Sequence, residues 1–267
     1  MDYLRIGENV LNYKASIIDH NRQTLVFVNS LGTDFRIWDG VVQALGDQFN
    51  IVLHDKRGHG LSDFDGMPML IESYANDLAS LLAQLKVSRA IFCGISVGGL
   101  IVQQLYNARP DLVSKLILSN TATKIGTSES WNTRIEAIKK NGIASIAEAI
   151  LERWFSAHYR SVKKDEFSIY RNMLVRTDQA GYIACCHALR DCDLTSQAAN
   201  ISIPTLCIVG EYDGSTPLAL VEATAKLIAN VQFEVMAGVA HLPCIENPAA
   251  FATLITKFIM ENQHEHS

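Results

Sequence analysis

The sequence lacks an apolar run long enough to span a bilayer, and its first residues lack the pattern of a signal peptide. It also lacks an excess of basic residues, because its formal net charge is -5. An acidic chain of this kind argues against nucleic acid as a general partner. We therefore expect a cytoplasmic protein that has no membrane and no nucleic-acid partner, and the sequence does not indicate its oligomeric state.

Paired metal ligands are also missing. The six cysteines stand mostly within apolar segments, without the paired spacing that zinc sites use, and the eight histidines form no cluster. Reduced, buried cysteines are the default expectation for such a pattern. The sequence therefore predicts no metal site.

The chain has 267 residues, of which 48% are hydrophobic, enough for a large α/β core. Strands are predicted over 10–18, 24–28, 49–54, 90–95, 113–119, 203–209 and 232–236, and helices over 71–85, 218–228 and 248–260. This alternation predicts a mainly parallel central sheet flanked by helices. The strand signal disappears over 124–195, where the spacing of apolar residues is helical. We therefore expect a core made of 1–123 and 196–267, with 124–195 as a helical cap.

A glycine-flanked serine follows the predicted strand over 90–95 and precedes an amphipathic helix. The residues are Gly94-Ile95-Ser96-Val97-Gly98, which match the G-x-S-x-G pattern of a nucleophile elbow. In such a turn the serine hydroxyl stands clear of the sheet, and the next backbone N–H, that of Val97, faces the same place. The pattern alone also fits an ordinary turn between a strand and a helix, so its weight depends on the rest of the chain.

Two possible partners of Ser96 follow later strands. Asp213 comes after the strand over 203–209, and His241 comes after the strand over 232–236, so both emerge at the same sheet edge as Ser96. Serine, acid and histidine in this chain order are typical of an α/β-hydrolase catalytic triad. Taken singly, Asp213 could be a capping carboxylate and His241 an ordinary loop histidine. Glu211 is a rival acid, but it lies closer to the end of its strand.

An oxyanion hole needs two N–H donors, of which Val97 supplies one. The second is expected from the loop after the strand over 24–28, whose residues are Asn29-Ser30-Leu31-Gly32, and we predict the N–H of Leu31. Many related hydrolases have histidine and glycine at the start of this loop, so Asn29 departs from the common pattern.

Together these motifs resemble the α/β-hydrolase superfamily over nearly the whole chain. The segments 28–34, 55–63 and 181–191 resemble more narrowly the 3-oxoadipate enol-lactonases. The resemblance implies an α/β-hydrolase fold and hydrolysis of 3-oxoadipate enol-lactone to 3-oxoadipate, in the β-ketoadipate pathway of bacterial aromatic catabolism. It implies no cofactor.

The charge of the predicted cap gives an independent indication of the substrate. Residues 124–195 carry a net charge of +2 and the remainder carries -7, which suits a small anionic lactone, although a solvated helical surface would give the same count. Arg134 could bind a carboxylate, and Trp131, on the same helix face, could wall a small ring. Trp154 is a further candidate for the wall. For each of these residues, ordinary packing is an equally good explanation.

The predicted enzyme is a serine hydrolase in which His241 activates Ser96 and Asp213 orients His241. A carboxylesterase or a carbon–carbon bond hydrolase of the same fold would have the same triad. A ligand receptor with this fold could keep the triad while turning over very slowly. The sequence leaves these alternatives open.

Overall fold

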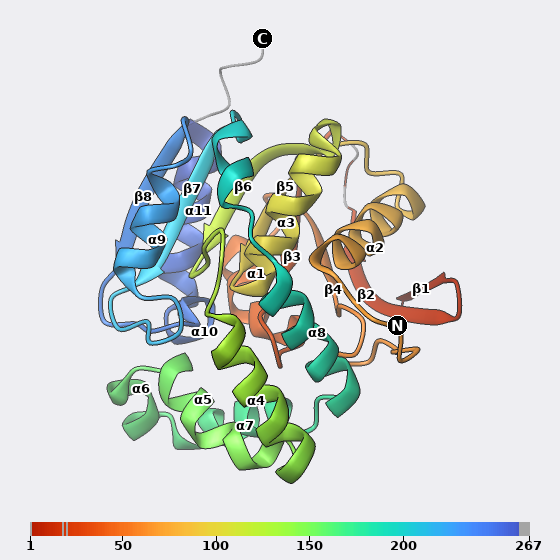
Figure 1. Ribbon diagram of the computed structural model, residues 1–267. Helices are drawn as coiled ribbons and strands as arrows, with labels where there is room; N and C mark the ends of the chain where they lie inside the picture. Colours follow the sequence, from red (N-terminus) through yellow and green to blue (C-terminus); the bar gives the residue numbers. More distant parts are fainter. Residues whose placement is uncertain (1, 18, 20, 262–267) are drawn as a thin grey trace.

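The computed structural model describes residues 2–17, 19 and 21–261 (Figure 1). Over these residues, eight strands form one sheet in the order β1-β2-β4-β3-β5-β6-β7-β8. The strands are β1 (Asp2–Ile6), β2 (Asn9–Ser16), β3 (Thr24–Val28), β4 (Asn50–His54), β5 (Ala90–Ile95), β6 (Val113–Ser119), β7 (Thr205–Gly210) and β8 (Val231–Met236). β2 is antiparallel to β1 and β4, and the other neighbours are parallel. The predicted mainly parallel sheet is confirmed, and residue 18, at the end of the predicted first strand, lies outside the described residues.

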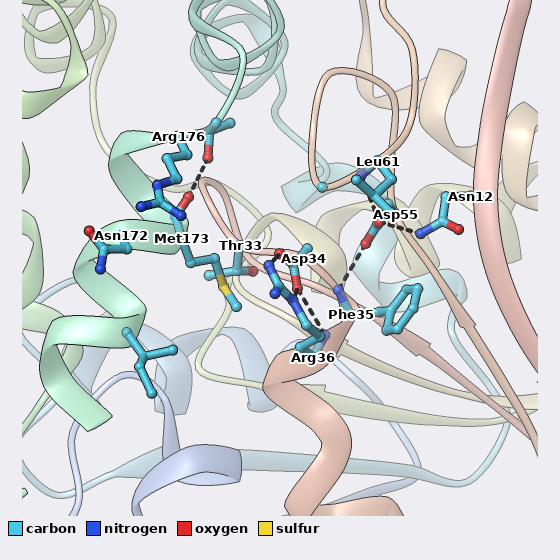
Figure 2. A pocket seen from close by; sticks show the side chains of 13 residues that line it. Asn12, Thr33, Asp34, Phe35, Arg36, Asp55, Leu61, Asn172, Met173 and Arg176 are labelled. Atoms are coloured by element: carbon cyan, nitrogen blue, oxygen red, sulfur yellow. Dashed lines mark hydrogen bonds and ion pairs between the residues drawn. The ribbon is translucent and has the colours of Figure 1, made fainter. Parts of the chain in front are cut away.

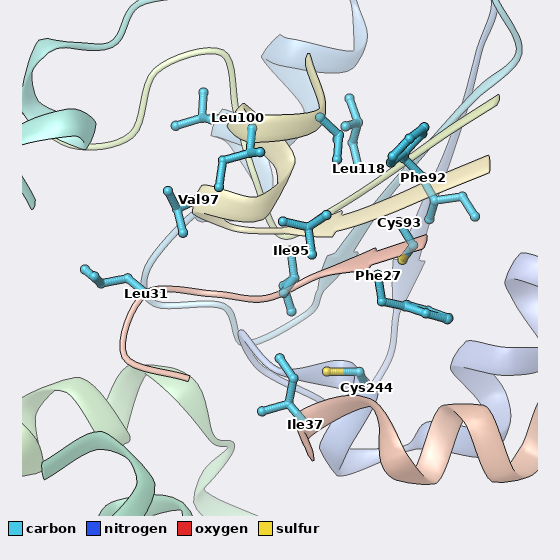
Figure 3. Close-up of a cluster of buried hydrophobic side chains, with 14 of the residues drawn as sticks. Phe27, Leu31, Ile37, Phe92, Cys93, Ile95, Val97, Leu100, Leu118 and Cys244 are labelled. Carbon is cyan, nitrogen blue, oxygen red and sulfur yellow. The ribbon is translucent and has the colours of Figure 1, made fainter. Parts of the chain in front are cut away.

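The central strands are buried on both faces. Every residue of β3, β4, β5 and β7 is buried, which explains why their sequences are apolar runs rather than alternating patterns. Their side chains form one hydrophobic core, part of which Figure 3 shows around Phe27, Ile95 and Leu118. β8 is an edge strand and is only half-buried.

Some helices pack against this sheet, and others lie beyond it. They are α1 (Asp39–Leu45), α2 (Ile71–Gln84), α3 (Val97–Ala108), α4 (Ser128–Asn141), α5 (Ala147–Trp154), α6 (Ala157–Val162), α7 (Lys164–Val175), α8 (Gln179–Asp191), α9 (Leu218–Ala225), α10 (Pro243–Glu246) and α11 (Pro248–Glu261). α1 packs against α11, and α2 packs against α3. Within the described part of the chain, no helix combines the length and the apolar character needed to cross a membrane.

The five helices α4–α8 all lie between β6 and β7 in the sequence, with no strand among them. We call residues 128–191 the helical segment. In Figure 1, α4–α7 gather at one end of the molecule beside α10, and α8 leads back toward the sheet. Within the stretch 124–195, where helical spacing was predicted, residues 143–154 form a 3-10 turn (Ile143–Ile146) followed by α5.

The parallel strands bring distant loops to one edge of the sheet. The loops after β3, β5, β7 and β8 all start at carboxyl ends of parallel neighbours. Ligands of open α/β sheets bind outside this edge. The candidate residues in these loops therefore lie on the side where a site is expected.

Candidate active site

Ser96 occupies a strained turn between β5 and α3. Its φ is 57° and its ψ is -120°, in the left-handed half of the backbone map that residues with a side chain rarely adopt. A Cβ on Gly94 would collide with the carbonyl oxygen of Gly98, and a Cβ on Gly98 would collide with that of Val28. The two glycines are therefore a steric requirement of the turn. This geometry agrees with the predicted nucleophile elbow.

His241 and Asp213 form a buried pair. The Nδ1 atom of His241 lies 2.9 Å from Oδ2 and 3.0 Å from Oδ1 of Asp213, and His241 is 1% exposed. His241 also lines the same pocket as Ser96. A carboxylate on Nδ1 fixes the imidazole so that its Nε2 is the atom available to another group.

Four further donors hold the Asp213 carboxylate. The N–H groups of Ser215 and Thr216 donate to Oδ1 at 2.7 and 2.9 Å, and the hydroxyl of Thr216 and the amide of Asn120 donate to Oδ2 at 2.7 and 2.8 Å. Burial tends to raise the pKa of Asp213, but the charge and hydrogen bond of His241, with these donors, lower it below its ordinary value. The carboxylate therefore stays ionised beside the imidazole. The rival acid Glu211 instead accepts a hydrogen bond from the exposed N–H of Gly238.

Asn120 has a role that the sequence analysis missed. It stands directly after β6. Its φ is 47°, its amide donates to Asp213 and to the carbonyl of Ala240 at 3.3 Å, and its oxygen accepts from Ser119. Asn120 therefore connects the acid loop to the residue before His241. The only signal in the sequence is an asparagine, a residue that tolerates a positive φ, directly after a predicted strand.

The loop after β3 places Ser30 and Leu31 on the pocket wall with Ser96. Asn29, which departs from the common histidine, donates to the carbonyl of His54 at 3.1 Å and accepts from the indole of Trp38 at 3.2 Å. Its side chain therefore ties the start of the loop to β4 and to the turn before α1. Leu31 therefore lies on the pocket wall with Ser96, and its role as an oxyanion donor stays a prediction.

The pocket that contains Ser96 and His241 has a volume of about 160 Å³. All three residues predicted to bind substrate line it: Trp131, Arg134 and Trp154. Its other lining residues include Ser130, Arg153, Tyr182, Leu189 and Ser215, which the sequence analysis did not single out. The helical segment therefore forms the outer wall of the pocket, opposite the loops of the sheet.

Two arginines give this wall a positive charge. The guanidinium of Arg134 lies 4.7 Å from the centre of the Trp131 ring, and the stem of Arg153 packs against Gly214, next to Asp213. Burial, and then the charge of Arg134, lower the pKa of Arg153. Over the described ranges, neither arginine has a carboxylate within 4.0 Å. Arg153 directly precedes Trp154, and that adjacency is the signal that could have identified it.

A larger cavity of about 530 Å³ lies elsewhere, between the loops after β3 and β4 and helix α7 (Figure 2). Its acidic groups are already bound: Asp34 pairs with Arg36 at 2.6 Å, and Asp55 accepts from Asn12, Phe35 and Leu61. Neither Ser96 nor His241 lines this cavity. The smaller pocket is therefore the candidate active site.

This fold and this constellation of serine, histidine and aspartate define the α/β-hydrolase class. The family described as serine aminopeptidase, S33, matches residues 19–248. The chain belongs to the α/β-hydrolase superfamily, as its motifs predicted.

More specific relatives narrow the resemblance. The chain is 33% identical to 3-oxoadipate enol-lactonase 2 of Acinetobacter baylyi, over 94% of this chain and 93% of that protein. It is 36% identical to 3-oxoadipate enol-lactonase 1 of the same organism, over 91% of each chain. The crystal structure of the enol-lactonase from Burkholderia xenovorans LB400 matches with a TM-score of 0.93 and 33% identity, over 97% of this chain and 100% of that one. The predicted resemblance to enol-lactonases is confirmed.

Proposed function

We propose that this protein hydrolyses 3-oxoadipate enol-lactone to 3-oxoadipate through an acyl-enzyme on Ser96. The observation that carries the proposal is the joint lining of one small pocket by Ser96, His241 and two arginines without carboxylate partners among the described residues. Such a pocket suits a small ester that bears a carboxylate. The A. baylyi and B. xenovorans relatives, whose names specify enol-lactonase activity, support this choice of substrate.

The first half of the reaction opens the ring. His241 takes the proton of Ser96 as its oxygen attacks the lactone carbonyl, and Asp213 stabilises the resulting imidazolium. The oxyanion accepts hydrogen bonds from the N–H groups of Leu31 and Val97. The C–O bond of the ring then breaks, and the enolate oxygen that leaves takes a proton from His241. The enol remains tethered to the acyl group and becomes the ketone of the product.

The second half releases the product. His241 takes a proton from water, whose oxygen attacks the ester between Ser96 and the acyl group. The bond to Ser96 breaks and the serine oxygen recovers its proton from His241. One water is consumed, and the product leaves with one carboxylate more than the lactone had.

The helical segment is assigned the recognition of the substrate carboxylate. Arg134 and Arg153 lie on α4 and α5 and face the same pocket, so a carboxylate between them would accept charged hydrogen bonds from two neighbouring cations. Trp131 and Trp154 supply flat walls for the lactone ring. A volume of about 160 Å³ is below that of ordinary drug-sized sites, which fits a substrate with a single small ring. In this assignment residues 124–195 act as the cap, and 1–123 and 196–267 act as the catalytic core.

The experiment that tests this function compares two substrates. Steady-state hydrolysis of 3-oxoadipate enol-lactone is measured beside that of p-nitrophenyl acetate, with Ser96→Ala in parallel. We expect kcat/KM to favour the lactone by at least about 100-fold, the ratio that charged hydrogen bonds of about 3 kcal/mol supply. We expect Ser96→Ala to abolish both activities.

Three results would contradict the proposal in different ways. A higher kcat/KM for the neutral ester would point to a carboxylesterase with the same triad. Activity that survives in Ser96→Ala would exclude the acyl-enzyme itself. Very slow turnover of both substrates would indicate a receptor.

A further inference from the structure

One buried lysine touches the loop that supplies Leu31. The ammonium of Lys56 donates a hydrogen bond of 2.5 Å to the carbonyl oxygen of Ser30, and the lysine is 2% exposed. The carbonyl of Ser30 and the N–H of Leu31 belong to one peptide group. That group is planar and trans, so its C=O and N–H point in opposite directions. Whatever fixes the carbonyl oxygen therefore also fixes the direction of the Leu31 N–H.

The same carbonyl has two neutral donors. The hydroxyl of Thr33 donates to Ser30 O at 2.9 Å and the N–H of Thr33 donates at 3.4 Å. Lys56 adds the charged and shorter hydrogen bond. A cation on the carbonyl oxygen also polarises the peptide, which makes its N–H a better donor toward a negative charge.

Among the described residues, no ion pair accounts for the buried charge of Lys56. In the described part of the chain, no carboxylate lies within 4.0 Å of its ammonium. Burying a cation in this way is costly, and an apolar side chain would fill the space more cheaply. The cost suggests that the ammonium acts on the carbonyl that it touches.

Several titratable groups surround Lys56. Burial lowers its pKa to about 8, against the opposing influence of Cys185 on α8, Asp55 on its own loop and Asp34 after β3. Tyr74 on α2 interacts with Cys185 through a hydrogen bond. The remaining neighbours are His54 at the end of β4 and His59 in the following loop; for each of them, burial and the charge of Lys56 lower the pKa. Both histidines are therefore neutral near pH 7, and Lys56 is the group of this cluster that loses a charge near pH 8.

We propose that Lys56 is a positioning residue whose ammonium holds the Ser30 carbonyl and thereby aims the Leu31 N–H at the oxyanion. The assignment rests on the proposed function, because Leu31 matters only as an oxyanion donor. It acts through the backbone, without contact between Lys56 and the substrate. It should therefore affect any ester that reacts at Ser96, whether or not the ester carries a carboxylate.

The main test replaces the ammonium by an apolar group of similar length, Lys56→Met. We expect kcat to fall about 30-fold for both the enol-lactone and p-nitrophenyl acetate, somewhat less than the loss of a whole oxyanion donor. KM should change less than about threefold, since the ground state gains little from the oxyanion hole. Thr33→Val removes a neutral donor to the same carbonyl and should lower kcat only about threefold. Lys139→Met, which removes an exposed lysine of the helical segment, is the control for charge and should leave kcat unchanged.

The pH profile supplies a second readout that a merely structural lysine would not give. In the unsubstituted protein, kcat should decline at alkaline pH with a midpoint near the pKa of about 8 of Lys56, after subtraction of spontaneous hydrolysis. That decline should be missing in Lys56→Met. The unsubstituted profile also tests the proposal if Lys56→Met does not fold.

Three results would overturn the proposal: a kcat for folded Lys56→Met within about twofold of the unsubstituted value, a loss confined to KM for the lactone, or an unsubstituted kcat that stays flat through about pH 9. Failure of the proposed function is a separate result, namely turnover of the acetate without turnover of the lactone. In that case the kcat of Lys56→Met on the acetate still decides the role of Lys56.

Discussion

The loops at the sheet edge and the helical segment face one pocket but satisfy their charged groups in opposite ways. In the loops, His241, Asn120 and Thr216 all bind the carboxylate of Asp213. On the helical side, Arg134 and Arg153 face the pocket without a carboxylate partner among the described residues. The carboxylate of Asp213 is held by its donors before any substrate binds. Arg134 and Arg153, in contrast, gain a carboxylate partner only when an anionic ligand binds.

This difference separates chemistry from selectivity. Preorganised groups lower the barrier because they need no rearrangement during the reaction. Groups that gain a partner on binding contribute instead to affinity and to the choice between substrates. We therefore expect substitutions in the loops to change kcat for every ester, and substitutions of the helical arginines to change KM for anionic esters alone.

The prediction with the largest expected effect tests this contrast by replacing one histidine in each region. His241→Gln should lower kcat by about 10⁴-fold or more for the lactone and for p-nitrophenyl acetate, because the base is lost. His158→Gln, in exposed α6, should change neither value. Steady-state kinetics with both substrates is the measurement. A similar fall in kcat in the two variants, or no fall in His241→Gln, would contradict the role of His241 as the base.

The second prediction concerns the arginines. Arg134→Met and Arg153→Met should each raise KM for the enol-lactone roughly 10-fold, the effect of losing a charged hydrogen bond of about 1.5 kcal/mol. KM for p-nitrophenyl acetate should stay within about twofold in both variants. In the double variant, KM for the lactone should rise by less than the product of the two single increases, since the two cations are neighbours.

Arg171→Met is the matched control for these arginines. Arg171 lies on α7 and is half-exposed, and its partner is Glu148 at 2.7 Å. It should leave both KM values unchanged. If KM rises equally for the two substrates in the Arg134 and Arg153 variants, these residues support the shape of the pocket rather than bind a carboxylate.

The two regions also differed in how far the sequence could predict them. The elbow around Ser96 follows from local sterics, because only glycine fits on either side of the turn, so its pattern is visible in five residues. Asp213 and His241 follow from their places after strands, which hydrophobic runs reveal. The position of Arg153 next to Trp154 made it a possible candidate, but its inward-facing role depends on α5 packing against Gly214, a contact between distant segments. Asn120 was missed for the same reason, because its partners lie in two other loops.

Strand β1 was also missed. Asp2–Ile6 is short and mostly exposed, so it has no apolar run, and its pairing with β2 defines it more than its composition does. Helical content in the segment from 124 to 195 was predictable from spacing, whereas the way its helices meet the loops was not. The features that the sequence did not predict are those determined by contacts between different helices, strands and loops.

The third prediction concerns stability at acid pH. Burial, and next the charge of Lys56, lower the pKa of His54 to about 4. Such a histidine is neutral when folded but binds a proton when unfolded, so the free energy of unfolding should fall as pH drops below about 6.5. Between pH 7 and pH 5.5, His54 alone should cost about 1 kcal/mol. Urea unfolding at both values is the measurement.

His54→Gln should reduce this acid-dependent loss, and His158→Gln, at an exposed position of the helical segment, should not. The contrast locates the acid sensitivity in the sheet-edge side of the molecule. An equal loss in the unsubstituted protein and in His54→Gln would show that other groups cause it.

The smallest predicted effect concerns Glu246, a carboxylate that joins the two regions. Glu246 accepts from the N–H of Ala240 at 2.7 Å, next to His241, and from the hydroxyl of Ser156 at 2.5 Å, just after α5. Ser156→Ala removes only the hydroxyl bond from the helical side, so we expect a change of about threefold in KM for the lactone and none in kcat for the acetate. Glu246→Gln places a donor where acceptors are needed, and should lower kcat about threefold for both substrates as well. If Ser156→Ala lowers kcat for the acetate as much as Glu246→Gln does, the helical segment positions His241 directly, and chemistry and selectivity are not divided between the two regions.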